Sequence, residues 1–525
     1  MREEGGREKR KRNERDTIRI YTLLGELNCL CYMNLSLLIL LPLLTALLIL
    51  LSKQLAQIRI IGLAGSLAQL GTASWLLKLY MDQRAAGNNA THLFETNTVW
   101  FKALNINYHI GIDGIALAMI LLTSLIVVAG ILVSWTMEKL SKEYFFLLVL
   151  LSMGAYGFFI SLDLFTLFFF LEVAVIPKFL LIGIWGSGRK ENSAMKLALM
   201  LMAGSALVFV GLMGIYYNTH TFDMVEIGKM GMSLGVQKFF FPFLFLGFGI
   251  FAALFPFHTW VPDGHASAPT AASMFLAGIS MKLGGYGCLR MAALMPDAAH
   301  SYSWIIILLA TIAIIYGAFA TMMQTDLKYI NAYSSISHCG FVILGIGMLN
   351  KTSINGAVIQ MVSHGLMTAL FFAAIGMIYS RTHTRMVAQL GGLLKAMPFI
   401  STVFVIAGLC SLGLPGFSGF VAEMTVFMGS WQNPDGVYRA ATVISAASIV
   451  VTAVYILRAT GRTIMGPISD EHALLSDATW NEKLAAGLLI IGILIIGLAP
   501  FLINQLIMPS TDFLMININK SLTLK

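Results

Sequence analysis

Charged residues are scarce in this sequence. Asp, Glu, Lys and Arg make up 11% of its 525 residues, whereas soluble domains carry about 25%. Hydrophobic residues make up 58%, and the mean hydropathy is +0.80. Apolar stretches of about 20 residues, which is enough to cross a hydrocarbon core of about 30 Å, recur from residue 35 almost to the end. The composition excludes an ordinary soluble domain and indicates an integral membrane protein embedded in the lipid bilayer.

Cysteine is also scarce. The five cysteines, Cys29, Cys31, Cys288, Cys339 and Cys410, do not stand at metal-ligand spacing. This excludes a disulfide framework, a zinc site and an iron–sulfur cluster, and we expect no metal in this chain. The formal charge of +8 is attributed to loops that orient membrane helices, and we expect no nucleic-acid partner.

The apolar stretches predict an all-α polytopic membrane protein. We expect about fourteen transmembrane helices, over residues 35–52, 60–80, 112–136, 143–162, 164–186, 194–217, 239–257, 268–290, 303–322, 326–348, 354–380, 395–428, 437–462 and 482–504. Two longer polar inserts separate them, at 81–111 and 463–481. The second insert is amphipathic and could lie on the membrane surface.

The distribution of basic residues predicts the orientation. Loops that retain Lys and Arg face the cytoplasm, and the loops after predicted helices 1, 3, 5, 9, 11 and 13 are the basic ones. They hold or adjoin Lys53, Arg59, Lys139, Lys142, Arg189, Lys190, Lys196, Arg381, Arg385, Lys395 and Arg462. Because the helix number is even, we expect both termini on the outer side of the cell membrane.

Residues 1–32 do not fit this orientation. The stretch "MREEGGREKRKRNERDTIRI" carries eight basic residues that would have to cross the membrane. We interpret the extension as a disordered charged tail or as upstream translation of a chain that starts at Met33, and residues 33–525 as a single membrane domain. No small-residue cleavage site follows, which argues against a signal peptide.

Ionisable residues stand inside the apolar segments. The stretch "FFFLEVAVIPKFLLIGIWG" contains both a carboxylate and an ammonium, although an ionisable group at membrane depth costs at least about 2.5 to 3.5 kcal/mol. Seven such groups are candidates for function: Glu172, Lys178, Lys282, Lys328, His338, His364 and Glu423.

Each of these groups also has a structural interpretation. Lys328 is close to a helix end, from which its side chain could snorkel, and His338 and His364 could be neutral groups bonding between helices. Spread together over several helices, however, Glu, Lys and His groups are typical of a proton relay, because their proton affinities shift as neighbouring charges move. We therefore predict a proton pathway.

Two predicted helices contain residues that break helices. Pro256 stands near the end of helix 7, and Pro415 and Gly416 stand within helix 12. Unwound backbone is tolerated at membrane depth where it lines a water-filled cavity, and matched interruptions mark inverted repeats in transporters. The breaks predict two inverted five-helix repeats, helices 4–8 over about 143–290 and helices 9–13 over about 303–462.

These segments together resemble a known family. "GIDGIAL", "DLFTLFFFLEVAVIPKFLLIGIWG", "PFHTWVPDGHASAPTAASMFLAGISMKLGGYGCLR", "DLKYINAYSSISHCGF" and "GLPGFSGFVAE" are similar to the antiporter-like subunit M (subunit 4) family of proton-pumping NADH:quinone oxidoreductase, respiratory complex I, which is related to the Mrp-type antiporters. The resemblance runs from about residue 33 to residue 504.

The resemblance implies fourteen helices, two inverted repeats and broken helices 7 and 12. It implies that Glu172 is the helix 5 glutamate, Lys282 the central lysine and Glu423 the glutamate of the outer half-channel, with His338 and His364 between the last two. No cofactor is implied in this chain. NADH, FMN, iron–sulfur clusters and quinone are expected in partner subunits, and other antiporter-like subunits as membrane neighbours.

One family element is missing. Relatives carry a helix 7 lysine at the position of Phe251, and Lys178 in helix 5 is an extra lysine. We hypothesise that Lys178 supplies the charge that helix 7 lacks, beside Glu172. The alternative is that Lys178 snorkels to the inner interface, because Trp185 and Arg189 follow closely.

The sequence thus predicts a proton-translocating subunit of a quinone-reducing complex, which acts as a translocase without a redox centre of its own. Two alternatives stay open at this point. They are an Mrp-type cation/proton antiporter subunit and a membrane-arm subunit of a related hydrogenase complex.

Overall fold

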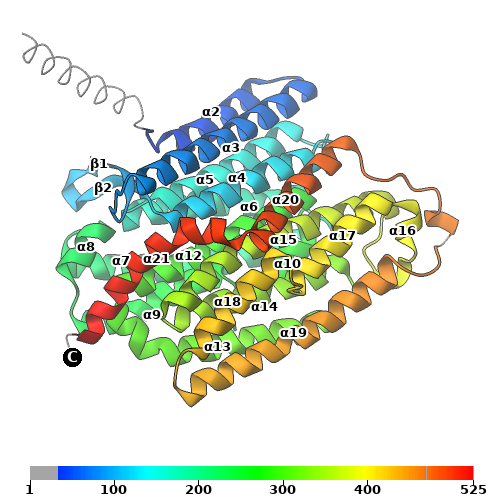
Figure 1. Ribbon diagram of the computed structural model, residues 1–525. Coiled ribbons are helices and arrows are strands. Elements are labelled where there is room, and N and C mark those ends of the chain that lie inside the picture. The colour runs from blue at the N-terminus through cyan, green and yellow to red at the C-terminus, as the bar shows by residue number, and fades with distance from the viewer. Residues whose placement is uncertain (1–32, 469, 524–525) are drawn as a thin grey trace, which may run out of the picture.

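The computed structural model describes residues 33–468 and 470–523, with side chains up to residue 519. Its helices run side by side in one bundle (Figure 1). We call the end that carries the two strands and α8 the hairpin end, and the end that carries α16 the opposite end. The two ends lie at opposite sides of Figure 1. The predicted extension 1–32 lies outside the described residues.

The first half of the bundle precedes residue 295. Its helices are α2 (Leu37–Leu51), α3 (Leu55–Ala85), α4 (Gly114–Val133), α5 (Ser141–Ile160), α6 (Leu164–Trp185), α7 (Lys190–Thr219), α8 (Met224–Met230), α9 (Leu234–Phe251), α10 (Trp260–Ser267), α11 (Thr270–Phe275) and α12 (Met281–Leu294). A π-helical turn, Leu276–Ser280, joins α11 to α12.

The second half follows. Its helices are α13 (Pro296–Met322), α14 (Leu327–Gly347), α15 (Lys351–Thr382), α16 (Leu393–Ala396), α17 (Pro398–Ser411), α18 (Ser418–Trp431), α19 (Gly436–Thr463), α20 (Trp480–Leu498) and α21 (Pro500–Thr523). Each of the fourteen predicted segments overlaps at least one of the described helices. Eleven described helices are long and apolar enough to cross a membrane by themselves; the count of fourteen crossings stays a prediction.

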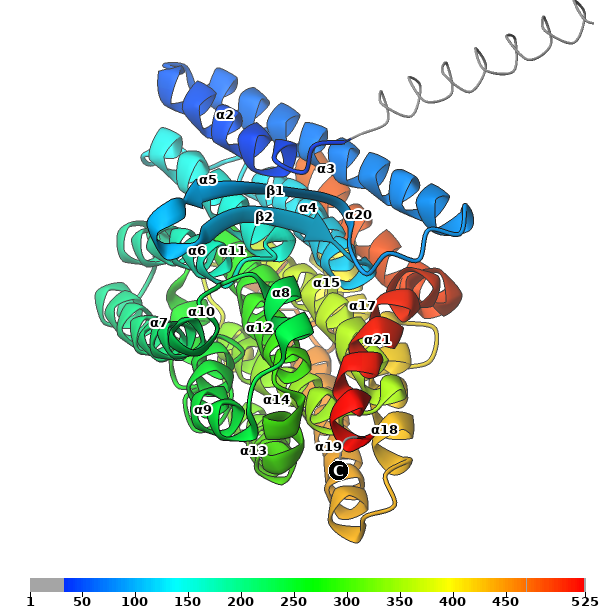
Figure 2. The ribbon, with the colours of Figure 1, turned by 90° about the vertical axis from the view of Figure 1, so that its left-hand side faces the viewer.

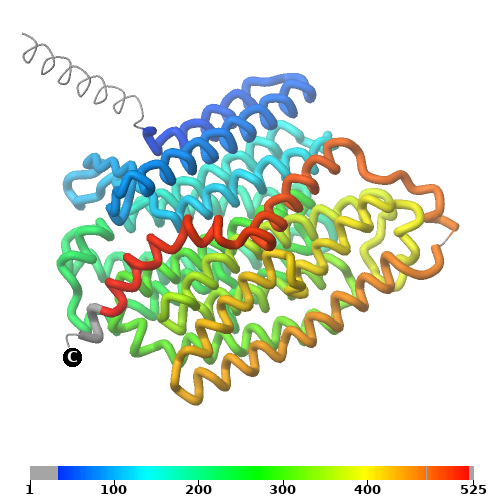
Figure 3. The backbone as a smooth tube through the Cα atoms, viewed as in Figure 1, coloured from blue at the N-terminus to red at the C-terminus, as the bar shows by residue number. Residues whose placement is uncertain are grey.

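Two described elements were not predicted from the sequence. The insert 81–111 contains strand β1 (Leu93–Phe101) and most of strand β2 (Ile106–Ile112), which pair antiparallel in a fold that is otherwise helical. The last predicted helix ends early, at Leu498, and α21 follows it (Figure 3). Ser510 of α21 accepts a hydrogen bond from the Gly114 amide, so α21 crosses the hairpin end (Figure 2).

The two helices that were predicted to be broken are interrupted in the structure. Pro256 lies between α9 and α10, and Pro415 and Gly416 lie between α17 and α18. Gly413 and Gly416 have φ of 72° and 96°, which glycine adopts without steric cost. Proline supplies no amide hydrogen to continue a helix. Each break therefore follows from residues at that position.

The same turn occurs once in each half. "THT" occurs at 219–221 and at 382–384, and in each copy the first threonine donates to the carbonyl of the third residue. The turn pairs with the start of a helix that is capped by aspartate, as the bridges Asp163 to Asp223 and Asp326 to Met386 show. One copy lies beside α8 and the other just before α16, at opposite ends of Figure 1. The two copies thus lie at opposite ends of the bundle, and the inverted repeats stay a prediction.

α15 is the central helix. Its most apolar membrane-length window is wholly buried, and it packs against α14, α17, α18 and α20. Outer helices such as α3 and α19 keep exposed apolar faces, with residues such as Ile60 and Val450, as expected for a protein surrounded by lipid. The buried ionisable groups are therefore positioned by helices in the interior.

Candidate functional site

The centre of the bundle holds a chain of polar contacts between α12, α14, α15 and α18. Lys282 Nζ lies 2.8 Å from His364 Nδ1. The ring centroids of His364 and His338 are 5.4 Å apart, and His338 Nδ1 lies 3.3 Å from Glu423 Oε1. All four side chains are buried. Four predicted residues from four helices are thus brought together in one line.

The π turn ends two residues before Lys282. Lys282 Nζ donates to the carbonyl oxygen of Ala277, at 2.6 Å, inside that turn. A π turn leaves backbone carbonyls without their usual helical partners, and such turns are frequent at functional sites. The backbone therefore supplies Lys282 with an acceptor that a regular helix would not offer.

The other end of the chain of contacts lies beside the break between α17 and α18. His338 Nε2 lies 3.1 Å from Ser411 Oγ at the end of α17, and Gln360 Nε2 lies 3.3 Å from His338 Nδ1. A Cβ on Gly413 would approach Glu423 Oε2 to 2.7 Å. Glycine at this turn thus leaves room for the carboxylate beside the broken helix.

Lys328 lies apart from this line. Its Nζ donates to the Ala268 carbonyl, at 2.6 Å, between α10 and α11, and the structure gives it no direct contact with His338 or His364. His265 of α10 is fully buried, interacts electrostatically with both Lys282 and Lys328, and has no hydrogen-bond partner on either ring nitrogen. The sequence analysis missed His265, although its motif was recognised.

Glu172 and Lys178 are not in direct contact. Glu172 is half-buried on α6 and accepts a hydrogen bond from Ser205 of α7, and no described ion pair within 4.0 Å joins it to Lys178. Lys178 is 1% exposed, and its Nζ lies 5.8 Å from the ring centroid of Phe251. The ammonium is thus directed to α9 rather than to the membrane surface.

A second buried charge pair joins α4 to α12. Arg290 donates to Asp113 Oδ2 at 2.7 Å and to the hydroxyl of Tyr286 at 2.8 Å. Asp113 also accepts from the Ala116 amide and so caps α4. Because each charge has a partner, this pair is consistent with a structural role.

Outside the membrane-spanning segments, the hairpin end holds a cluster of His109, Asp223, Glu95 and His92. His109 Nδ1 lies 2.7 Å from Asp223 Oδ2, and His92 Nδ1 lies 3.6 Å from Glu95 Oε1. Burial lowers the pKa of His109, but its hydrogen bond to Asp223 and the nearby carboxylates outweigh burial and raise the pKa overall. The hydrogen bond from His92 lowers the pKa of Glu95. Within residues 33–468 and 470–523, His, Cys, Asp and Glu form no group of three that could hold a metal ion.

Comparison with known proteins identifies the family. A family profile described as "NADH:quinone oxidoreductase/Mrp antiporter, TM" matches residues 161–449. The NADH-quinone oxidoreductase subunit M of Rickettsia bellii is 36% identical over 418 residues, which are 79% of this chain and 84% of the relative. The NAD(P)H-quinone oxidoreductase chain 4-2 of Synechocystis is 35% identical over 431 residues, with 81% and 76% covered.

Solved structures share the fold. A chain of respiratory complex I from Thermus thermophilus with bound NADH matches with a TM-score of 0.83 at 22% identity, covering 92% of this chain and 99% of that one. A chain of the Mrp complex from Dietzia matches with a TM-score of 0.81 at 19% identity, covering 92% and 97%. Profile, relatives and fold agree, and the chain belongs to the NADH:quinone oxidoreductase/Mrp antiporter family of membrane proteins.

Proposed function

We propose that this chain is a proton-translocating membrane subunit of an NADH:quinone oxidoreductase. The observation that carries the proposal is the buried line from Lys282 through His364 and His338 to Glu423. Such groups exchange protons when neighbouring charges change, because charge interactions in a poorly screened interior are strong. The order differs from that read along the sequence, since His364 lies between Lys282 and His338.

In this proposal, protons enter at Glu172 and Lys178 and pass to Lys282. Lys178 takes the place of the missing helix 7 lysine, which is supported by the position of its ammonium against Phe251. A lysine that is buried without a hydrogen-bond partner is costly in a membrane interior and is retained for function. Lys328 and His265 provide a side branch to Lys282.

The proposal assigns no cofactor to this chain. NADH, FMN, iron–sulfur clusters and quinone belong to partner subunits, and the chain serves as a translocase subunit beside antiporter-like neighbours. It places the protein in the cell membrane with the hairpin end outside. The start of α2 is tied to this end by the hydrogen bond from Tyr108 to Ser36, and α21 crosses it.

The Mrp-type alternative is supported by the fold and the shared family profile. The relatives at about 36% identity carry the name NADH-quinone oxidoreductase subunit M, whereas the Mrp chain is 19% identical. This difference favours the quinone-reducing complex.

The test is Lys282→Met in the assembled complex in membrane vesicles. We expect fewer protons moved per quinone reduced, because a methionine cannot exchange a proton with His364. Lys238→Met is the matched control, since Lys238 is exposed on α9. An unchanged proton-to-electron ratio in Lys282→Met would contradict the proposal.

A further inference from the structure

We propose that protons leave Glu423 along the hydroxyl-bearing face of α19 and reach the outside through a pocket at the hairpin end. This inference rests on the proposed function and extends it to the exit route. The hydroxyl face consists of Thr442, Ser445, Ser448, Thr452 and Tyr455, with Tyr438 at its outer end.

These residues recur every three or four positions, so they share one side of the helix. Each of the five is at most 7% exposed. The opposite side of α19 is apolar and exposed, with Val443, Val450 and Leu457 all more than half exposed. The polar side therefore faces the bundle, and the apolar side faces lipid.

The inner end of the face lies at the predicted proton site. The Tyr455 phenol interacts electrostatically with Glu423 and lies near the hydroxyls of Thr452, Ser411 and Ser334. Ser411 in turn contacts His338. The face thus begins where the line of buried charges ends.

Two groups on the face have unused hydrogen-bonding capacity. Tyr455 Oη and Ser445 Oγ are buried and have no hydrogen-bond partner in the protein. Buried polar groups are normally satisfied by protein or by ordered water, and buried water typically makes two to four such bonds. Water bound to these hydroxyls would complete a chain between them.

The outer end of the face opens into a pocket of about 310 Å³. Tyr438 lines it together with Ser303, Asn350 and Asn433, and Tyr438 is hydrogen-bonded to Ser303 of α13. These polar side chains line the pocket beside the apolar Met348, Leu349 and Pro434. The pocket stands at the hairpin-end turns between α14 and α15 and between α18 and α19. The pocket is therefore a suitable exit to outer water.

α15 packs closely against α18 on another side. A Cβ on Gly356 of α15 would approach the Val426 amide nitrogen to 2.5 Å, and one on Gly429 would approach the Ser353 amide nitrogen to 2.2 Å. The two backbones therefore touch between Glu423 and the hairpin end, which leaves no room for water between them at these two positions. A proton leaving Glu423 outward is directed to the α19 side.

The transfer balances without a further reactant. The carboxyl group of Glu423 releases its proton to the first water or hydroxyl. Each following group accepts one proton and gives up another, so one proton reaches outer water and the hydroxyls end unchanged. The next proton from His338 restores the Glu423 carboxyl group.

The test removes hydroxyls with little change in shape. In the assembled complex, the triple variant Thr442→Val, Thr452→Val and Tyr455→Phe is expected to lose as much proton pumping per quinone reduced as Glu423→Gln. Thr463→Val is the control, because Thr463 is equally buried at the opposite end of α19. Unchanged pumping in the triple variant overturns the exit route when Glu423→Gln stops pumping. Unchanged pumping in Glu423→Gln instead overturns the proposed function itself.

A second measurement does not depend on turnover. Ser445→Cys and Ile444→Cys place thiols on the polar and the lipid-facing sides of α19. We expect a membrane-impermeant thiol reagent added from outside to label Ser445→Cys faster, because thiolates form in water. Equal labelling of the two variants would overturn the route, even if the triple variant fails to assemble.

Discussion

At the scale of the residue, the position of the Lys178 ammonium depends on a neighbouring helix. Lys178 belongs to α6, yet its ammonium lies against Phe251 of α9, at the position where the family resemblance predicts a lysine. The spacing along α6 could not reveal this, because the side chain direction depends on packing against another helix. The extra lysine could be seen in the sequence, whereas the direction of its side chain required the fold.

The first prediction moves the lysine from position 178 to position 251. Lys178→Met is expected to reduce proton pumping per quinone reduced, since the buried cation is lost, and Lys178→Met with Phe251→Lys is expected to restore it. Lys178→Arg should not pump normally, because arginine does not release its proton. Full pumping by Lys178→Met alone would show that the lysine carries no protons.

Gly284 provides a second test at this scale. Gly284 lies two residues after Lys282. A Cβ at this position would approach the amide nitrogen of Ala252, at the end of α9, to 2.2 Å. Gly284→Ala is expected to destabilise the protein by about 1–3 kcal/mol, because backbone must shift to relieve the overlap. Gly71→Ala meets no neighbour within 4 Å and is the control. Thermal unfolding in detergent measures both, and equal midpoints would refute the close approach.

Among the elements, the strand pair and α8 are joined by an ion pair. His109 of β2 and Asp223 before α8 are 2.7 Å apart. The hairpin escaped prediction because β1 is exposed along most of its length and shows no regular burial alternation. Alternation of apolar and polar residues does not predict a strand of which only one end is buried.

This ion pair makes stability depend on pH. The pKa of His109 is raised overall. Its contribution to the free energy of unfolding is therefore full below the unfolded pKa of about 6.5, and it is lost as the pH rises through the folded pKa. Burial raises the pKa of Asp223, but hydrogen bonds from His109 and backbone amides outweigh burial and lower the pKa overall. The contribution of Asp223 to stability is therefore lost only in strong acid.

We therefore expect Asp223→Asn, which can still cap α8, to lower the thermal midpoint more at pH 5.5 than at pH 8.5. Thermal scans of the wild type and the variant at both values measure it. A gap that widens at high pH would exclude the ion pair as its cause.

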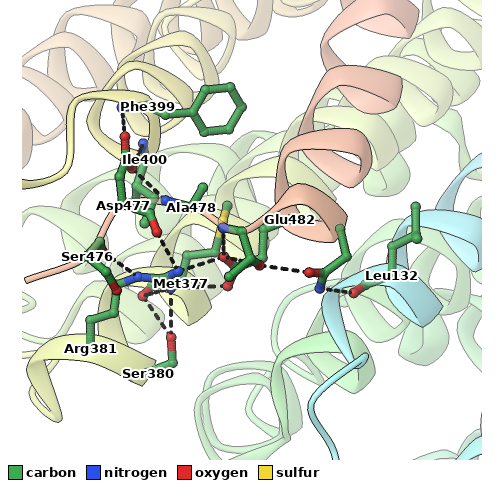
Figure 4. A network of polar contacts seen from close by, with 12 residues as sticks. Leu132, Met377, Ser380, Arg381, Phe399, Ile400, Ser476, Asp477, Ala478 and Glu482 are labelled. Carbon is green, nitrogen blue, oxygen red and sulfur yellow. Dashed lines mark hydrogen bonds and ion pairs between the residues drawn. The ribbon is translucent and has the colours of Figure 1, made fainter. Parts of the chain in front are cut away.

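Arg381 joins several elements at the opposite end (Figure 4). It donates to both carboxylate oxygens of Glu482 and to the carbonyls of Ser476 and Asp477. Asp477 accepts from the amides of Phe399 and Ile400 at the start of α17. The segment between α19 and α20 is thereby fixed to α15 and α17.

Arg381→Gln is expected to lower the free energy of unfolding by about 2 kcal/mol, because Glu482 loses its charged hydrogen-bond donor and keeps only the bonds from Thr479. Lys351→Gln breaks the exposed pair with Asp512 and should cost less than about 1 kcal/mol. Denaturation in detergent compares the two. Equal losses would mean that burial of the Arg381 pair does not matter.

At the scale of the whole molecule, much of the architecture could be predicted from the sequence. The helices followed from apolar length, and the breaks at Pro256 and Pro415 followed from proline chemistry. The contact between Lys282 and His364, 82 residues apart, depends on how helices pack and left no local signal. α21 was missed because Pro509 and Asp512 interrupt its apolar pattern.

The orientation of the whole bundle gives the last prediction. Lys102 lies exposed at the hairpin, and Leu474 is 97% exposed at the opposite end. We expect an impermeant thiol reagent to label Lys102→Cys from outside intact cells and Leu474→Cys only after the membrane is opened. The described native cysteines are buried, which limits background. The reverse labelling pattern would invert the proposed orientation.

The π turn before Lys282 has a consequence for the register of the chain. Such a turn holds one residue more than a regular helical turn, which corresponds to a rotation of about 100°. Deleting one residue from Leu276–Ser280 would let α11 and α12 fuse into one continuous helix and would rotate Lys282 away from His364. The direction of the Lys282 ammonium thus depends on the number of residues in the π turn. An insertion or deletion in this turn would separate Lys282 from His364 without altering any ionisable group.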